Sequence, residues 1–182
     1  MQAGLLLPYA WGWLGWAYGL TGDVTRALTY VKRGIKILQE MGLVFGVPFL
    51  FKCLAEFHFY SGDLESAERT IQEALEFSQR HGEKASEAIS RIWWGRIWGQ
   101  KESSAFEAAE ESILHGIRMG EECKFRPIVA EGYLYLGELY FVRGRREKAR
   151  DHLKKAEGMF QVMGMNSFVG KAREVMGRLR ED

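Results

Sequence analysis

The side chains capable of acid–base or metal chemistry are scattered along the chain. None of the histidines has Cys, Asp or Glu neighbours at metal-ligand spacing. The histidines are His58, His81, His115 and His152. Glu107, Glu110 and Glu111 could form a carboxylate pair for general acid–base catalysis, but their charged helical setting is typical of solvated surface. We therefore expect no catalytic residue, no metal site and no cofactor, so that the chain is not an enzyme.

One segment, GMNSFVGKA at 164–172, superficially resembles a phosphate-binding loop. The spacing between Gly164 and Gly170 is one residue too long, and Ala172 replaces the Ser or Thr that would hold magnesium. No strand-like segment precedes it, so we reject a nucleotide site. Cys53 and Cys123 lie far apart and lack metal-ligand neighbours, which favours two reduced thiols and a cytoplasmic protein.

Composition and charge argue against nucleic-acid binding and membrane association. The formal net charge is +1, with 27% charged residues, whereas non-specific nucleic-acid binding needs an excess of Lys and Arg. We expect no nucleic-acid partner. The first 22 residues carry no charge, and 3–20 is an apolar stretch near the minimum length of a membrane span. Pro8, four glycines and the missing positive flank argue against a span or a signal peptide, so we expect no membrane association.

A recurring pattern organises the chain. Each copy has a large residue, Leu, a small residue, and an aromatic residue or His at helical spacing, then a turn and a closing Ala. The first copy is Trp11, Leu14, Gly15, Tyr18 and Ala27; the second is Phe51, Leu54, Ala55, His58 and Ala67; the last is Tyr133, Leu136, Gly137, Tyr140 and Ala149. A weaker third copy has Trp94, Gly95, Trp98 and Ala109. The small residue and the closing Ala would let two helices approach closely.

This pattern resembles the tetratricopeptide repeat over nearly the whole chain. The closing alanines are 40, 42 and 40 residues apart, against about 34 in the standard repeat. Such long repeats are similar to the C-terminal regions of bacterial signalling ATPases, class III adenylate–guanylate cyclases and MalT-type regulators. The resemblance implies an all-α, right-handed superhelical solenoid of antiparallel helix pairs, with about nine helices.

The expected organisation is a single domain over 1–182. Its repeats would cover 8–41, 47–81, 84–122 and 126–163, followed by a capping helix over 167–180. Within the repeats we expect helices at 8–20, 24–41, 47–60, 64–81, 84–99, 104–122, 126–142 and 146–163. Gly22-Asp23 and Gly62-Asp63 would each end one helix and cap the next.

A basic cluster occupies the corresponding turn of the last repeat. Residues 143–155 hold seven basic and two acidic side chains, and Arg145 and Arg146 fall where earlier copies have Asp. Cations at a helix start oppose the helix dipole. Two interpretations stay open, solvated surface variation and a patch for an acidic partner or domain. The patch would comprise Arg143, Arg145, Arg146, Lys148 and Arg150.

The resemblance also implies a concave surface lined by the first helices of the repeats. Carried onto this chain, the groove positions are Tyr9, Trp16, Lys52, Glu56, Phe59, Arg96, Glu138 and Phe141. They would suit an extended peptide or a helix lying across the aromatics, with Lys52 and Arg96 meeting acidic side chains. Ordinary groove polarity without a dedicated ligand is an equally open interpretation, and a small-molecule pocket between helices would need no motif.

The N-terminal segment has more apolar residues than the repeat uses. Those left over are Leu5, Leu6, Leu7, Trp13, Trp16 and Leu20. A surplus of this kind is normally covered, either by a preceding repeat or by another chain. The sequence thus predicts a non-catalytic protein-interaction scaffold, the repeat region of a larger bacterial signalling protein of the cyclase or MalT kind. The alternative is a free-standing adaptor that forms a homodimer through its aromatic N-terminal end.

Overall fold

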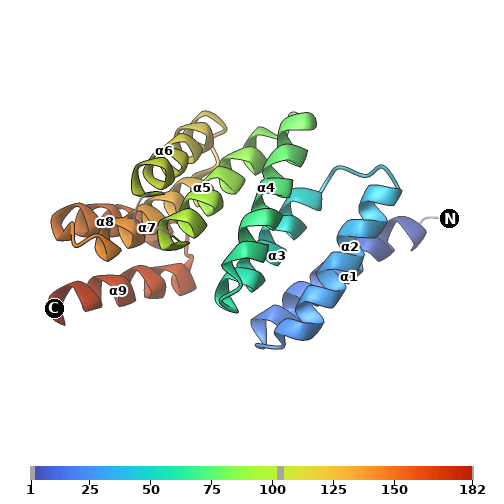
Figure 1. The fold of residues 1–182 in the computed structure, drawn as a ribbon, viewed down its shortest axis with the longest axis horizontal. Coiled ribbons are helices and arrows are strands. Elements are labelled where there is room, and N and C mark those ends of the chain that lie inside the picture. Colours follow the sequence, from blue (N-terminus) through green and yellow to red (C-terminus); the bar gives the residue numbers. More distant parts are fainter. Residues whose placement is uncertain (1–2, 102–104, 182) are drawn as a thin grey trace. The chain divides into compact units, whose positions relative to one another are not determined.

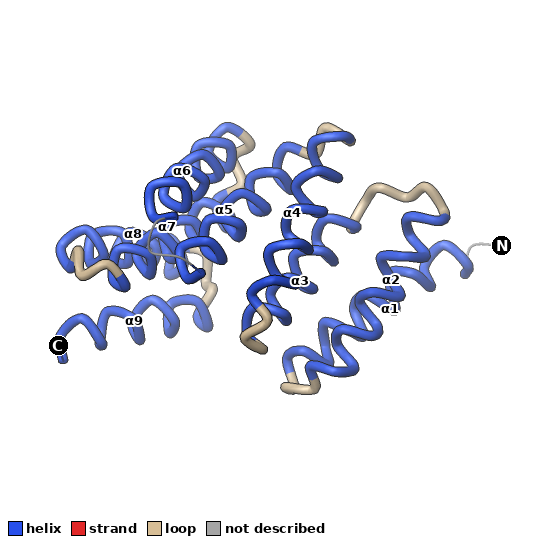
Figure 2. Tube along the Cα trace, in the orientation of Figure 1, coloured by secondary structure: helices blue, strands red, loops and turns tan. Residues whose placement is uncertain are grey.

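The structure, a computed structural model, describes residues 3–101 and 105–181, and the side chains of residues 3–5, 180 and 181 are left undescribed. Within these ranges the chain is all-α, as predicted, with helices joined by short turns and no strand (Figures 1 and 2). The helices are α1 Ala3–Leu20, α2 Val24–Glu40, α3 Val47–Tyr60, α4 Leu64–Arg80, α5 Lys84–Lys101, α6 Phe106–Glu122, α7 Arg126–Val142, α8 Arg146–Val162 and α9 Asn166–Glu181.

The chain separates into two compact units, Met1–Ser86 and Glu87–Asp182, whose boundary lies inside α5. In the first unit α2 packs on α1 and α3, and α4 packs on α3. In the second unit α7 packs on α6 and α8, and α9 packs on α8. The expectation of one domain over 1–182 concerns how the two units are joined, and it stays a prediction.

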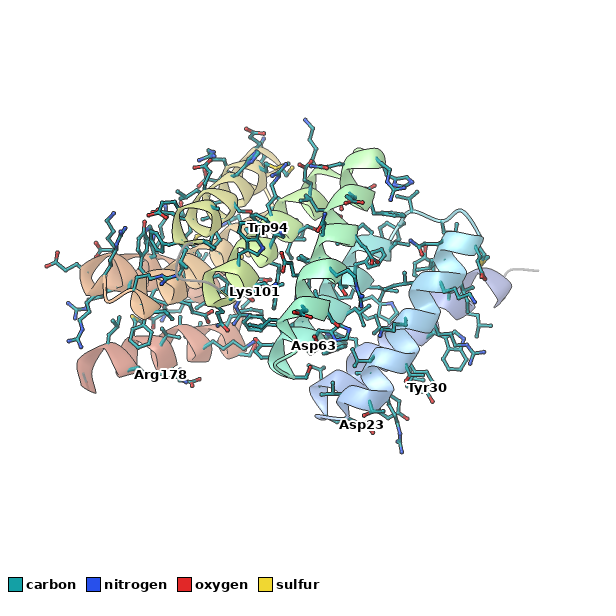
Figure 3. All side chains as sticks on the ribbon, in the orientation of Figure 1. Asp23, Tyr30, Asp63, Trp94, Lys101 and Arg178 are labelled. Atoms are coloured by element: carbon teal, nitrogen blue, oxygen red, sulfur yellow. The ribbon has the colours of Figure 1, made fainter. Side chains whose placement is uncertain are left out.

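The predicted turns and caps are confirmed in the first unit. Gly22 and Gly62 both have φ of +83°, a conformation that glycine adopts without strain. Asp23 accepts a hydrogen bond from the Arg26 amide, and Asp63 accepts one from the Ser66 amide. Each Asp therefore caps the helix that follows it, at the starts of α2 and α4 (Figure 3).

The small residue of the first helix lies directly on the second helix, as the repeat pattern predicts. A Cβ placed on Gly15 would lie 2.9 Å from the Ala27 carbonyl oxygen, and one on Gly95 would lie 2.5 Å from that of Ala109. The closing alanines are completely buried in all four copies. A larger side chain at either position would force the two helices apart, because interiors are closely packed.

Helix α1 begins at Ala3 and not at the predicted residue 8, so Pro8 lies inside it. Proline cannot donate a backbone hydrogen bond. Because Pro8 is near the start of α1, the missing hydrogen bond affects only the first turns of the helix. The backbones of α1 and α2 also meet here, since a Cβ on Gly34 would lie 3.0 Å from the Pro8 carbonyl oxygen. Packing against α2 thus keeps this segment helical.

At the other boundaries the differences are small. The predicted start of α6 at residue 104 lies outside the described residues, and the helix is seen from Phe106. The helix α9 covers the predicted range 167–180, and its role as a cap of the repeats stays a prediction. Among the residues that the structure describes, no helix is both long enough and apolar enough to cross a membrane.

Candidate functional site

The first unit contains a groove lined mainly by aromatic and apolar side chains. It lies between α1, the turn before α3, the start of α3, and the start of α5, and its volume is about 320 Å³. The lining residues are Tyr9, Trp13, Phe45, Gly46, Pro48, Phe49, Leu50, Glu83 and Ser86. All of them belong to the first unit. The volume falls within the range of small-molecule and side-chain pockets.

Local backbone geometry at Gly46 shapes one wall of the groove. Gly46 has φ of +82° as it opens α3, and a Cβ there would lie 3.0 Å from the Tyr9 ring. The Tyr9 hydroxyl donates a hydrogen bond to the Phe45 carbonyl at 3.1 Å. Glycine is therefore required for two reasons, its backbone conformation and the close approach of Tyr9.

The aromatic side chains of the groove contact one another and remain open to solvent. The Trp13 ring lies 5.3 Å from the Phe49 ring and 5.9 Å from Trp16, edge to face with the latter. Phe45 is 82% exposed and Trp13 is 52% exposed. Large apolar side chains exposed together in a concavity are typical of a binding surface. Glu83 contributes an acidic group at the rim.

The structure places the predicted groove residues of the first unit in different settings. Tyr9 lines the cavity, and Trp16 lies beside it in contact with Trp13. Lys52 and Glu56 form an ion pair with each other at 2.8 Å, one helical turn apart on α3. Phe59 is 8% exposed and so is part of the packed interior.

In the second unit, Arg96 and Glu138 bind each other across α5 and α7. Arg96 Nε lies 3.0 Å from Glu138 Oε2, and its guanidinium lies 4.0 Å from the centre of the Tyr135 ring. Arg96 is 8% exposed. Any acidic partner would have to displace Glu138, so recognition through Arg96 stays a prediction. Phe141, the last predicted groove residue, is half-buried.

The predicted groove did not include Trp13, Phe45 or Phe49, although Trp13 was among the surplus apolar residues expected to be covered. Trp13 lies one helical turn after Tyr9, and Phe49 lies three residues before Lys52, so both share a helix face with a predicted groove position. This spacing could have identified Trp13 and Phe49 as groove residues. Phe45 lies in the turn between α2 and α3, outside any helical periodicity, so helix-face reasoning could not reach it.

The basic cluster of the second unit is partly engaged with aromatic rings. The Arg145 guanidinium lies 4.4 Å from the centre of the Phe106 ring, and Lys155 Nζ lies 3.9 Å from that of Tyr133. Arg145 makes no side-chain cap on α8, so this cation–π contact offsets the unfavourable charge at the helix start. Arg146, Lys148 and Arg150 are exposed and Arg143 is half-buried. An acidic-partner patch here stays a prediction.

His58 is a core residue, as its repeat position predicts. It is 7% exposed, and its Nδ1 lies 3.5 Å from Asp63 Oδ2. Burial lowers the pKa of His58, and the positive charge of Lys32 adds to the effect. Within 3–101 and 105–181, no group of three or more His, Cys, Asp or Glu side chains could hold a metal ion.

Comparison with known proteins supports the repeat architecture. The family model "Tetratricopeptide repeat" matches residues 130–155, from the second turn of α7 to a point past the middle of α8. No curated protein matches the chain in sequence. Among solved structures, the apo form of RapI has a TM-score of 0.76 at 14% identity, covering 94% of this chain and 62% of RapI.

Two further structures name the repeat. A signal transduction ATPase with numerous domains from Pyrococcus horikoshii, with a tetratricopeptide repeat sensor, has a TM-score of 0.68 at 16% identity, covering 93% of this chain and 26% of that protein. Nearly identical TPR-like repeats of the kinesin-light-chain kind from Podosopora anserina have a TM-score of 0.62 at 12% identity, covering 96% of this chain and 97% of theirs. The chain spans less than two thirds of the first two proteins. Its fold is similar to that of tetratricopeptide-like helical repeat proteins over nearly its whole length.

Proposed function

We propose that the chain is a non-catalytic protein-interaction module whose first unit captures an apolar anchor of a protein partner in the aromatic groove. The observation that carries this proposal is the open cavity of about 320 Å³ with Phe45 82% exposed at its edge. Exposed aromatic side chains in a concavity are the usual anchors of protein interfaces. The tetratricopeptide-like fold supports the same role, because such helical repeats commonly bind proteins or peptides.

The chemistry of the groove suggests which segment would fit. Its walls are apolar and aromatic, and Glu83 supplies a negative charge at the rim. A peptide or helix with an aromatic or aliphatic anchor next to Lys or Arg would satisfy both features. Lys52 is already paired with Glu56, so the partner charge favoured at this groove is basic and not acidic.

A random peptide library displayed on phage tests the groove. We expect the wild-type chain to enrich sequences that combine an apolar anchor with a neighbouring basic residue. Phe45→Ser should weaken binding of the enriched peptides by about tenfold or more, because exposed aromatic anchors dominate interface energies. Phe125→Ser removes another exposed phenylalanine, 44% exposed and outside the groove, and should leave binding unchanged. Equal effects of the two variants would contradict the groove assignment.

We also propose that this chain is one region of a larger protein. We place the chain in a larger bacterial signalling protein of the cyclase or MalT kind, cytoplasmic, where it would hold a partner or a neighbouring domain in a set geometry. A multidomain signalling ATPase with a tetratricopeptide repeat sensor is one of the similar structures, and the chain covers 26% of it. Immunoblotting of source cells tests this placement. A band far above 20.9 kDa is expected, and a band near that mass would favour the free-standing adaptor.

A further inference from the structure

Two helix pairs of this chain contain the same stack of three rings. In the first unit Tyr30 lies between Trp11 and Tyr18, at 5.3 Å and 5.4 Å between ring centres (Figure 3 shows Tyr30 on α2). In the second unit His152 lies between Tyr133 and Tyr140, at 5.9 Å and 5.3 Å. Each stack has its rings nearly parallel, and its members occupy matching positions relative to Ala27 and Ala149. The two stacks are therefore repeat-equivalent.

The cations over the rings are equivalent as well. The Arg33 guanidinium lies 4.2 Å from the Trp11 ring centre, matching Lys155 over Tyr133 at 3.9 Å. Arg26 lies over Tyr18 at 5.3 Å, matching Lys148 over Tyr140 at 5.2 Å. A positive charge thus flanks each end of each stack.

In the second unit, α6 covers the stack with an aromatic ring and two carboxylates. The Phe106 ring lies 5.9 Å from that of Tyr140, and the Tyr140 hydroxyl donates a hydrogen bond to Glu110. The Tyr133 hydroxyl donates to Glu121 at 3.4 Å. These side chains, separated by four and eleven residues, lie on one face of α6.

Beside the stack, α6 also covers aliphatic side chains of α7. A Cβ on Gly132 would lie 2.4 Å from the Ile117 side chain, and one on Gly120 would lie 3.0 Å from that of Val129. Leu136 and Val129 share this face of α7 with Gly132 and are 0% and 5% exposed. The same α6 face therefore buries apolar surface and pairs with the polar edge of the stack.

The equivalent face of α1 and α2 is open. Leu14 and Leu7, which match Leu136 and Val129, are 40% and 53% exposed. Trp11 Nε1 is buried and has no hydrogen-bond acceptor among the described residues, whereas its counterpart Tyr133 has Glu121. Arg26 and Arg33 are exposed, and the ion pair of Arg26 with Asp23, at 3.3 Å, is also open to solvent. This face does not overlap the aromatic groove, because Trp11 and Tyr18 lie on the opposite side of α1 from Tyr9 and Trp13.

We propose that this open face of α1 and α2 binds an amphipathic helix of a partner protein that presents the chemistry of α6. The partner helix carries an aromatic residue, a carboxylate four residues later, an aliphatic residue after a further seven, and a second carboxylate after a further four. Its apolar side chains cover Leu7 and Leu14, and its carboxylates meet Arg26 and Arg33. Charge complementarity selects this helix, since the flanking groups of the stack are cationic.

A peptide with the sequence of residues 105–122, AFEAAEESILHGIRMGEE, is a direct probe for this face. In a fluorescence anisotropy titration against the full chain we expect saturable binding. The double change Arg26→Glu and Arg33→Glu should weaken it by about tenfold, because two charge pairs become repulsive. A peptide carrying Glu110→Lys and Glu121→Lys should recover affinity for that double variant. Arg80→Glu, an exposed arginine change on α4, is the matched control and should leave binding unchanged.

Four results would overturn the proposal. Absence of peptide binding, or equal binding by the double variant and the wild type, would remove this face as the site. If the double variant Lys148→Glu and Lys155→Glu lost binding while the Arg26 and Arg33 double variant kept it, the peptide would be replacing α6 in the second unit. Light scattering that finds a dimer of the chain alone, dissociated by the Arg26 and Arg33 changes, would assign the face to a second copy.

Discussion

The helix pairs α1–α2 and α7–α8 carry the same repeat pattern in different surroundings. Leu14 and Leu136 hold the same place in that pattern, but Leu14 is 40% exposed and Leu136 is completely buried. Both pairs contain a three-ring stack, yet the hydroxyl of Tyr140 donates a hydrogen bond to Glu110 of α6, while the Tyr18 ring lies under the guanidinium of Arg26 from its own pair, at 5.3 Å. The repeat pattern therefore determines how the two helices of a pair pack on each other. Whether the outer face of the pair is buried or exposed depends on the neighbouring helix.

The largest expected effect comes from truncating the equivalent leucines. Leu136→Ala leaves a cavity in a filled core and should lower the free energy of unfolding by about 3 kcal/mol. Leu14→Ala removes a side chain that is already partly solvated, and its cost should stay below about 1 kcal/mol. Urea unfolding followed by circular dichroism measures both. Similar losses for the two variants would mean that the α1 face is covered in solution.

A middle-sized effect is expected from removing the tyrosine hydroxyls. Burial and the hydrogen bond to Glu110 raise the pKa of Tyr140 to about 12. Tyr140→Phe should cost about 1 kcal/mol at neutral pH, because Glu110 loses a donor in a half-buried setting. Tyr18→Phe, at the open stack, should cost about half as much or less. Thermal unfolding at neutral pH compares the two, and a larger loss for Tyr18→Phe would reverse the expected order.

The raised pKa of Tyr140 also predicts how stability changes at alkaline pH. The unfolded chain releases the Tyr140 proton near pH 10, while the folded chain holds it to about pH 12. The folded state therefore binds more protons above pH 10, and stability falls as the pH rises through this range. Tyr140→Phe should make that fall shallower.

The smallest expected effect concerns the central ring of each stack. Burial, followed by the charges of Lys155 and Lys148, lowers the pKa of His152, although Asp151 and Glu110 oppose this. The unfolded chain then binds more protons, so stability is complete above the ordinary pKa of about 6.5 and falls as the pH decreases below it. His152→Tyr, which copies Tyr30, should reduce that fall. Unfolding midpoints at about pH 7.5 and about pH 5.5 measure this loss of stability in the wild type and the variant. Part of the loss should persist in the variant, because the pKa of His58 is also lowered.

Much of the fold was predictable because helix pairs depend on local spacing. Gly15, Gly95 and Gly137 with their closing alanines predicted where two helices would touch, and the Asp caps predicted where helices would begin. The start of α1 was not predicted. Pro8 is a local signal against helix, and contact with Gly34 on α2, which local spacing does not reveal, outweighs it.

The candidate site was predictable only in part. Tyr9 and Trp16 were predicted as groove residues from the resemblance to the tetratricopeptide repeat; Tyr9 lines the cavity, and Trp16 lies beside it in contact with Trp13. The binding role of the charges in the predicted groove stays a prediction, because a position on a helix face does not reveal the partners of a side chain. Lys52 pairs with Glu56, and Arg96 pairs with Glu138 across two helices. Phe45 could not be found this way, since a turn has no helical period.

By itself the sequence determined the helix pairs, their caps and the close contact of glycine with alanine, because each depends on residues near one another in the chain. Tertiary structure alone decided which repeat faces are covered. Leu14 and Leu136 show the reason: the exposure of a side chain depends on the helix packed against it, and that helix is specified elsewhere in the chain or by a partner. Burial is a property of the assembled neighbours, and the repeat pattern does not encode it.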